Sequence, residues 1–137
     1  MGVQPAGFKE NAHTADWELE VWAPDFPSLL EQAARGMYWL AKIKIQPGPR
    51  LNRSVIIRSE DLERGLVRFL EELRYLSEIE SLGFDSFDIR YDQATLHAEL
   101  TGAPIAEQSR EIKAVTYHNL IIRKTDRGLQ ARIIFDV

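Results

Sequence analysis

The sequence predicts an α+β fold, in which two helices pack on one mixed, mostly antiparallel sheet in the order β-α-β-α-β-β-β-β. Two observations support this. Apolar residues recur at helical spacing in residues 26–38 and 62–76, and stretches with strand character precede each of these segments. Four further strand candidates follow the second helical segment, and strands gathered after helices are typical of α+β proteins. With 137 residues and no Pro/Ser-rich linker, residues 1–137 are expected to form one domain.

The first half of the chain is expected to supply a strand, a helix and a second strand. Residues 1–14 are polar and contain Gly and Pro, which indicates a loose N-terminal arm or an edge strand. Residues 17–22 alternate apolar and polar side chains, as a half-buried strand does. Ser28 and Glu31 fit a capping box at the start of the first helix. The β-branched run 55–57 indicates a strand that is covered on both faces or lies centrally in its sheet.

The second half is expected to supply a helix and four strands. Ser59-Glu60-Asp61 provides a cap and acidic side chains where the second helix begins. Gly65 costs about 1 kcal/mol against Ala inside a helix, which suggests that it permits close packing. The four strands are expected at residues 87–91, 96–100, 112–122 and 129–135.

Composition excludes several classes of protein. The chain has no cysteine, so it holds no disulfide, thiolate zinc site, iron–sulfur cluster or cysteine nucleophile. Its formal net charge of −4 argues against a protein that wraps nucleic acid, although a local basic patch is compatible with that sum. It contains no phosphate-binding loop or dinucleotide-binding glycine motif. Without a membrane-length apolar run or a signal-peptide core, we expect a cytoplasmic protein.

Two short segments could supply metal ligands. His13 and Asp16 lie three residues apart just before the first predicted strand, although the spacing alone favours the alternative that Thr14 and Asp16 cap backbone groups at a turn. Asp136 precedes Val137 at the end of the sequence, where carboxylate and main-chain oxygens of the kind that hard cations prefer come together. The alternative for that end is a solvated tail, but the large apolar residues 133–135 favour a packed strand.

A third segment carries a lysine and a histidine on the predicted strand 112–122. Lys113 shares one face with Val115 and Tyr117, and His118 lies on the other face with Thr116. A lysine among apolar neighbours either reaches solvent or pairs with a carboxylate, so a salt bridge and a functional role both stay open.

Together these segments resemble the archease family. The resemblance runs from about Phe8 to the last residue. It is carried by four motifs in register: His13-Thr14-Ala15-Asp16, the helix Leu66-Val67-Arg68-Phe69-Leu70-Glu71-Glu72-Leu73-Arg74-Tyr75-Leu76, Lys113-Ala114-Val115-Thr116-Tyr117-His118, and Phe135-Asp136-Val137. The family fold, two helices on a coiled mixed sheet, agrees with the order of elements read from the sequence. Trp17 and Glu71 depart from the residues common in the family.

The resemblance implies a function that spacing alone does not indicate. Archeases activate the RtcB-type RNA ligase, which joins tRNA exon halves with GTP and a divalent metal. They promote guanylylation of the ligase and allow it to turn over repeatedly. The chain is therefore expected to be a metal-binding activator with no catalytic residue of its own and with the ligase as its partner. Direct nucleic-acid binding and membrane binding are not expected, and the sequence does not indicate an oligomeric state.

The resemblance also implies roles for individual residues. Asp16 and Asp136 match metal-site carboxylates, and Val137 adds a main-chain or terminal oxygen. Lys113 matches a charged residue that activation requires, and His118 matches a supporting position, as does His13. Oxygen-only ligation suits calcium, which we favour, and also magnesium or manganese.

Two other classes of function remain as alternatives. In a small metal-dependent hydrolase, the metal held by Asp16 and Asp136 would activate water, with His118 as general base. In a chaperone-like binding module, an acidic rim would bind a basic partner and the metal would be incidental.

Overall fold

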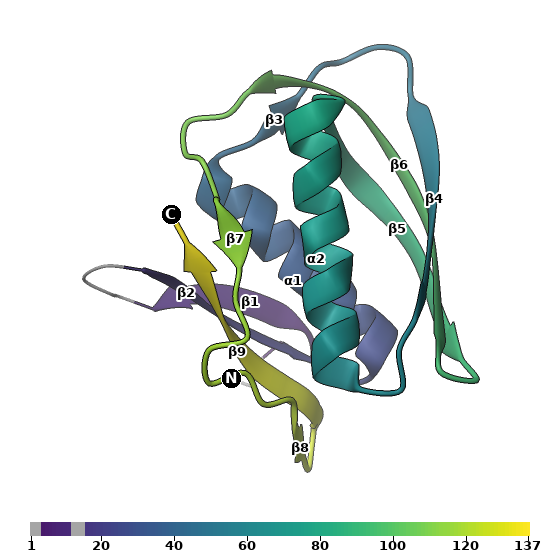
Figure 1. Ribbon diagram of the computed structural model, residues 1–137, viewed down its shortest axis with the longest axis vertical. Helices are drawn as coiled ribbons and strands as arrows, with labels where there is room; N and C mark the ends of the chain where they lie inside the picture. Colours follow the sequence, from purple (N-terminus) through teal and green to yellow (C-terminus); the bar gives the residue numbers. More distant parts are fainter. Residues whose placement is uncertain (1–3, 12–15) are drawn as a thin grey trace.

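The computed structural model describes residues 4–11 and 16–137, which form two sheets with two helices packed against both (Figure 1). The fold class is α+β with two helices, as expected. The expectation of one mixed, coiled sheet is wrong, because the described strands form two separate sheets in which every pairing is antiparallel.

The first sheet has five strands and lies at the lower left of Figure 1. Its strands are β1 (Gly7–Asn11), β2 (Trp17–Ala23), β7 (Ala114–Val115), β8 (Arg123–Thr125) and β9 (Gly128–Asp136). The order is β1-β2-β9-β7, and β8 pairs with β9 beside β7. β1 comes from the segment expected to be a loose arm or an edge strand, and it forms the edge next to β2.

The second sheet has four strands and lies on the right of Figure 1. Its strands are β3 (Lys44–Ile45), β4 (Leu51–Arg58), β5 (Leu82–Asp92) and β6 (Thr95–Glu107). The long β6 pairs with β5 along one edge, and with β4 and then β3 along the other. β4 is therefore an edge strand, and Ile56 within it is 68% exposed, so residues 55–57 are neither central nor covered on both faces.

The helix α1 (Phe26–Ala41) packs against β2 of the first sheet and β5 of the second. Its buried face is the predicted apolar stripe, which includes Leu29, Leu30, Ala33 and Met37. The expected capping box at Ser28 is wrong, because the helix begins one turn earlier. Asp25 is the N-cap and its Oδ1 accepts a hydrogen bond of 2.8 Å from the Ser28 backbone N–H.

The helix α2 (Leu62–Ile79) packs against β4, β5 and β7. Leu66, Phe69, Leu70 and Leu73 form its fully buried face, as the leucine spacing predicted. Asp61 is the N-cap, and the backbone N–H of Arg64 donates to its carboxylate, which lowers the pKa of Asp61. α2 thus bridges the two sheets.

Residues 112–122 do not form the long strand that their apolar content suggested. Only Ala114 and Val115 pair with β9, and residues 116–122 form a loop. Ile112 and Leu120 are nevertheless buried in the core, so the apolar pattern correctly reported burial but not sheet pairing.

Gly36 marks a close approach of α1 to β2. A Cβ at this position would lie 2.4 Å from Cδ2 of Leu19, whose side chain is fully buried. At Gly65, where the sequence suggested close packing, the nearest atom to such a Cβ is 3.6 Å away, which is an ordinary contact. The helix–sheet contact therefore requires a glycine at position 36 and not at position 65.

Gly36→Ala is expected to lower the free energy of unfolding by about 1–3 kcal/mol, because the added methyl group overpacks Leu19. Gly65→Ala is the matched change on α2 and should be neutral or raise stability by up to about 1 kcal/mol through helix propensity. Urea unfolding of both variants measures the difference. Equal destabilisation by the two changes would contradict this account of the packing.

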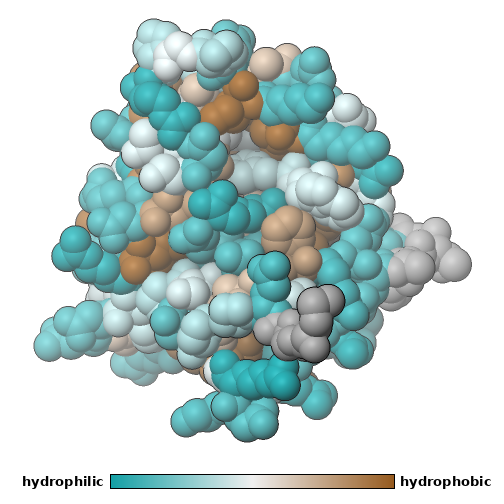
Figure 2. Space-filling view, turned by 180° about the vertical axis from the view of Figure 1, so that it is seen from behind, coloured by the Kyte–Doolittle hydropathy of each residue, from teal (hydrophilic) through white to brown (hydrophobic). Residues whose placement is uncertain are grey.

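On the face seen in Figure 2, hydrophobic residues form small patches separated by polar ones. No helix of the described residues has the length and apolar character needed to cross a membrane.

Candidate functional site

Three strands of the first sheet end side by side at the candidate site. Phe135 of β9 pairs with Trp17 of β2 on one side and with Val115 of β7 on the other. The next residues outward are Asp136 on β9 and Asp16, which directly precedes β2. Extending the register by one pair places Asp16 opposite Asp136. Two residues that lie 120 positions apart in the sequence, 136 minus 16, therefore meet at one end of the sheet.

The alternation of side chains defines the face on which these carboxylates lie. Phe135 and Ile133 are fully buried beneath the helices, so Asp136 points to the opposite, outer face of the sheet. Asp16 shares that face because directly opposite residues of an antiparallel pair project to the same side. Asp136 is exposed and Asp16 is half-buried, so both are open to solvent.

β7 brings Lys113 to the same end of the sheet. The Lys113 backbone N–H donates a hydrogen bond of 2.8 Å to the Asp136 carbonyl oxygen, and Ala114 pairs with Asp136. The Lys113 side chain is exposed, and in residues 4–11 and 16–137 no carboxylate lies within ion-pair distance of it. Val137 is half-buried and packs against the core. The salt-bridge alternative for Lys113 therefore has no partner within these residues.

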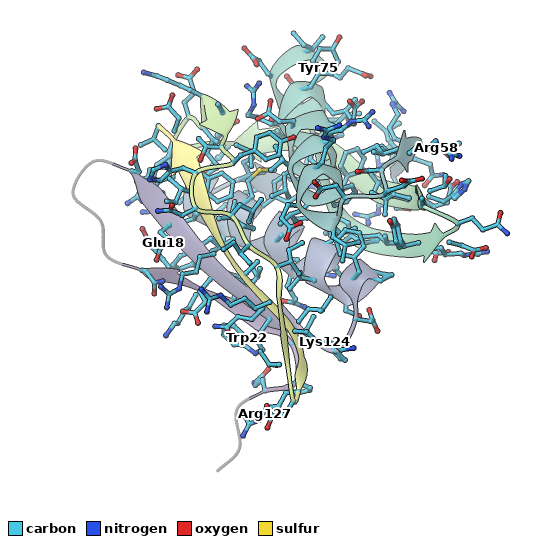
Figure 3. All side chains as sticks on the ribbon, turned by 60° about the horizontal axis from the view of Figure 1, so that its bottom comes forward. Glu18, Trp22, Arg58, Tyr75, Lys124 and Arg127 are labelled. Carbon is cyan, nitrogen blue, oxygen red and sulfur yellow. The ribbon has the colours of Figure 1, made fainter. Side chains whose placement is uncertain are left out.

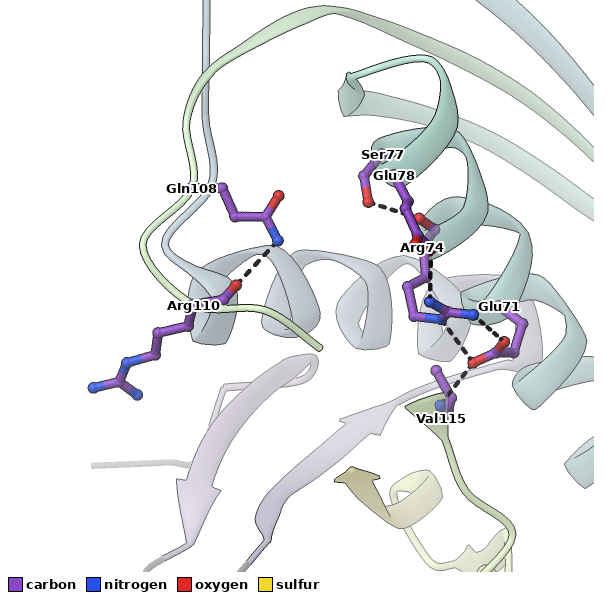
Figure 4. A network of polar contacts seen from close by, with 7 residues as sticks. All are labelled: Glu71, Arg74, Ser77, Glu78, Gln108, Arg110 and Val115. Atoms are coloured by element: carbon purple, nitrogen blue, oxygen red, sulfur yellow. Dashed lines mark hydrogen bonds and ion pairs between the residues drawn. The ribbon is translucent and has the colours of Figure 1, made fainter. Parts of the chain in front are cut away.

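Glu71 of α2 connects the helix to β7 through a side-chain hydrogen bond (Figure 4). Its Oε1 accepts a hydrogen bond of 2.6 Å from the Val115 backbone N–H. Arg74 donates from Nε and Nη2 to the two Glu71 oxygens, at 3.1 and 3.0 Å, and from Nη1 to Glu78 at 3.1 Å. The hydrogen bonds from Arg74 to Glu71 are the main cause of the raised pKa of Arg74. The network thus holds the strand that lies beside Asp136.

Glu71→Ala should cost about 1–3 kcal/mol of stability, because it removes the acceptor of the Val115 N–H and of Nε and Nη2 of the half-buried Arg74. Glu78→Ala is the matched control, since Glu78 contacts Arg74 but not β7 and its side chain is 60% exposed. Its cost should be within about 0.5 kcal/mol. Urea unfolding compares the two variants, and a cost for Glu78→Ala as large as that for Glu71→Ala would contradict the role given to the Val115 contact.

Arg110, in the loop before β7, contacts the first residue of β2. Its guanidinium carbon lies 5.0 Å from the centre of the Trp17 ring, a cation–π contact. The backbone N–H groups of Ser109 and Arg110 both donate to the Ala41 carbonyl at the end of α1. The bulky Trp17, a departure from the family pattern, thus has a packing role directly beside Asp16.

Of the two histidines expected to support the site, the structure describes only His118. His13 lies among residues 12–15, outside the described residues. His118 is exposed and lines a pocket of about 410 Å³ on the outer face of the same sheet. Glu18 and Ile134, which pair with each other two residues inward from Asp16 and Asp136, line the same pocket. His118 therefore lies on the face that carries the two carboxylates.

The donor chemistry of the site fits a hard divalent cation. Asp16 and Asp136 offer carboxylate oxygens on one face, and Val137 offers a main-chain oxygen beside them. Within the part of the chain that the structure describes, no group of three or more His, Cys, Asp or Glu side chains converges on one point. A cation held here would therefore complete its shell with main-chain oxygens, water or groups of a partner.

Sequence reasoning missed Glu71 and Arg110 as residues that build this site. Glu71 lies 44 positions before its partner Val115, and Arg110 lies 93 positions after Trp17. No local pattern links residues so far apart. The departure of Glu71 from the residue common in the family was the only available signal.

Comparisons with known proteins agree on one family. The profile of the Archease protein family matches residues 8–137. The chain is 31% identical to the protein archease of Methanosarcina mazei over the whole of both chains. It is 29% identical to that of Methanothermobacter thermautotrophicus, over 96% of this chain and 99% of the relative.

Solved structures agree as well. The solution structure of a Methanobacterium thermoautotrophicum protein matches with a TM-score of 0.69 and 25% identity, covering 96% of this chain and 99% of that one. The crystal structure of an archease from Thermotoga maritima, described as a possible chaperone, matches with a TM-score of 0.68 over 94% of each chain. Its identity of 19% supports the fold alone.

Proposed function

The chain belongs to the archease family, and on that premise we propose that it is an accessory protein that activates an RtcB-type RNA ligase in tRNA splicing or RNA repair. Activation here means faster guanylylation of the ligase and repeated turnover. The observation that best supports the proposal is the arrangement of Asp16, Asp136 and Lys113 at the end of three adjacent strands.

Asp16 and Asp136 are the proposed holders of a divalent cation, with calcium as our first choice and magnesium or manganese as alternatives. When bound, the cation supplies positive charge that can neutralise phosphate charge at the ligase. The two carboxylates would hold it on the outer, solvent-facing side of the sheet. Lys113 adds an exposed ammonium at the same end of the sheet, where it can pair with an acidic group of the ligase or with a phosphate.

The chemistry of RNA joining would then belong to the ligase. The sequence holds none of the motifs that bind nucleotide phosphates through a glycine-rich loop. We therefore propose that the chain alone neither joins RNA nor hydrolyses GTP. Its contribution would be to position charge at the active site of another protein.

The test is RNA joining by the cognate ligase, present at a small fraction of the RNA concentration, with GTP and metal. With this protein added, we expect many joining events per ligase. Without it, we expect about one. Equal yields in both reactions would overturn the proposal. Turnover of a phosphoester by the isolated chain would instead favour the metal-dependent hydrolase.

A further inference from the structure

The β8–β9 hairpin is a basic segment in an acidic protein. Residues 123–132 contain Arg123, Lys124, Arg127 and Arg132 but only one acidic residue, Asp126. Among the described residues, none of these four cations has an ion-pair partner, whereas seven other Lys and Arg side chains do. The segment therefore carries positive charge that no carboxylate of the described residues offsets at ion-pair distance.

Two of these cations converge on one pocket. Arg123 pairs in register with Gln130, and Arg132 lies two residues further along β9, so both project from the outer face of the sheet. Both line the pocket of about 410 Å³ that also contains His118 and Asn119. In Figure 3, Glu18 and Trp22 lie along β2, and Lys124 and Arg127 mark the β8–β9 hairpin.

Acidic residues on this face do not neutralise the two arginines. Glu20, which lies opposite Arg132, accepts a hydrogen bond of 2.6 Å from Gln130 and pairs with Lys9 at 3.5 Å. Glu18 lines the pocket and accepts a hydrogen bond of 2.6 Å from Asn11. Two arginines against one already bonded carboxylate leave the pocket with net positive charge.

The pocket is continuous with the proposed metal site. Arg132 lies four residues from Asp136 on the same strand and the same face, which is about 13 Å. Ile134 lies between them and lines the pocket. A ligand held by Arg123 and Arg132 could therefore extend to the carboxylate end of the sheet.

The kind of ligand follows from the donors. Guanidinium groups match the geometry of phosphate oxygens and bind them through two parallel hydrogen bonds. Asn119 and Gln130 add neutral amide donors at the same pocket. The polar lining offers little apolar surface for a hydrophobic ligand.

We infer that the pocket between His118, Arg123 and Arg132 binds a phosphate group of a substrate of the ligase. This rests on the proposed function and deepens it, because it gives the activator its own contact with a substrate. The phosphate group can come from GTP or from RNA. The net charge of −4 does not oppose this, since it is a sum over the whole chain and the cations are concentrated here.

The test is direct binding by the isolated protein, measured by calorimetry with four probes. They are GTP, inorganic phosphate, and a short single-stranded RNA with either a 3′-phosphate or a 3′-hydroxyl end. The test variant is the double substitution Arg123→Gln, Arg132→Gln. The matched control is Arg58→Gln, Arg64→Gln, which removes two exposed arginines, one at the end of β4 and one in the first turn of α2.

The unchanged protein should bind at least one phosphate-bearing probe. The test variant should bind that probe at least about tenfold more weakly, the effect of losing hydrogen bonds to a charged group. The control should bind within about twofold of the unchanged protein, because its arginines lie outside the pocket. If RNA is the ligand, the test variant should also lower the salt dependence of binding by about one to two phosphate contacts.

The probes separate the sources of the phosphate. Binding of GTP but not RNA assigns the pocket to the nucleotide, and binding of RNA but not GTP assigns it to the nucleic acid. Absence of binding to all four probes, or equal losses in the test and control variants, overturns the inference. If no probe binds but the ligase is still stimulated, the pocket assignment fails while the proposed function stands. If a probe binds as expected but the ligase is not stimulated, the phosphate site stands and the proposed function fails.

Discussion

Replacing Asp136 by alanine is expected to abolish stimulation of the ligase and leave the fold intact, and Asp16→Ala should do the same. Each change removes one of two carboxylates that the sheet register brings together. The loss of stimulation should be at least about tenfold, the effect that even outer-shell changes produce at metal sites. Both residues lie outside the buried stripes of the helices, so thermal unfolding should change little. RNA joining and thermal unfolding are the two measurements.

Asp92→Ala is the matched control for these changes. Asp92 is another exposed aspartate at a strand end, but it belongs to β5 of the second sheet. Its loss changes the net charge by the same amount and should leave stimulation unchanged. Near-normal stimulation by Asp136→Ala or Asp16→Ala would remove the argument for a metal site, as would equal losses in all three variants.

Phe135→Ala should have the largest effect on stability, about 3–5 kcal/mol. Phe135 is fully buried and pairs with both Trp17 and Val115, so its removal leaves a cavity where the three strands of the site meet. Urea unfolding measures the loss. Phe87→Ala is the comparison, since Phe87 is half-buried on β5 and should cost clearly less. A loss below about 1 kcal/mol for Phe135→Ala would show that the end of β9 is not packed as the structure describes.

The helices could be predicted from the sequence because their signal is local. The apolar stripes of α1 and α2 recur every three to four residues, and each stripe is buried as expected. The start of α1 was placed wrongly because Ser28 and Glu31 fit a capping box, while Asp25 performs the capping. Pro27 in the first turn was the available signal, since proline suits a position whose N–H has no partner.

The division into two sheets could not be predicted, because strand pairing depends on contacts between distant residues. Residues 112–122 have the composition of a strand, yet Leu120 is buried from a loop and only Ala114 and Val115 pair. The β-branched run at Ile56 favoured a covered strand, yet β4 lies at an edge. Composition indicates which residues are buried, and it does not indicate which strand lies beside them.

The candidate site could be predicted only in part, because its residues come together through contacts between distant parts of the chain. Asp16 and Asp136 could be selected because each lies next to an apolar run that predicts a strand end. Their placement opposite each other, and the anchoring of β7 by Glu71, follow only from the tertiary structure. Likewise, Arg123 and Arg132 are ordinary surface arginines in the sequence, and only the register of the β8–β9 hairpin places them on one face.

The most direct test of the account follows guanylylated ligase over time, with the cognate ligase, GTP and metal, in the presence of this protein or of its Asp136→Ala variant. The account predicts that the unchanged protein speeds the appearance of the guanylylated form and restores it after each round of joining. It predicts that the Asp136→Ala variant does neither. The claim is that this chain activates the ligase through the carboxylates at the end of β2 and β9. It would be contradicted if the time course were the same with the unchanged protein, with the variant and with no added protein.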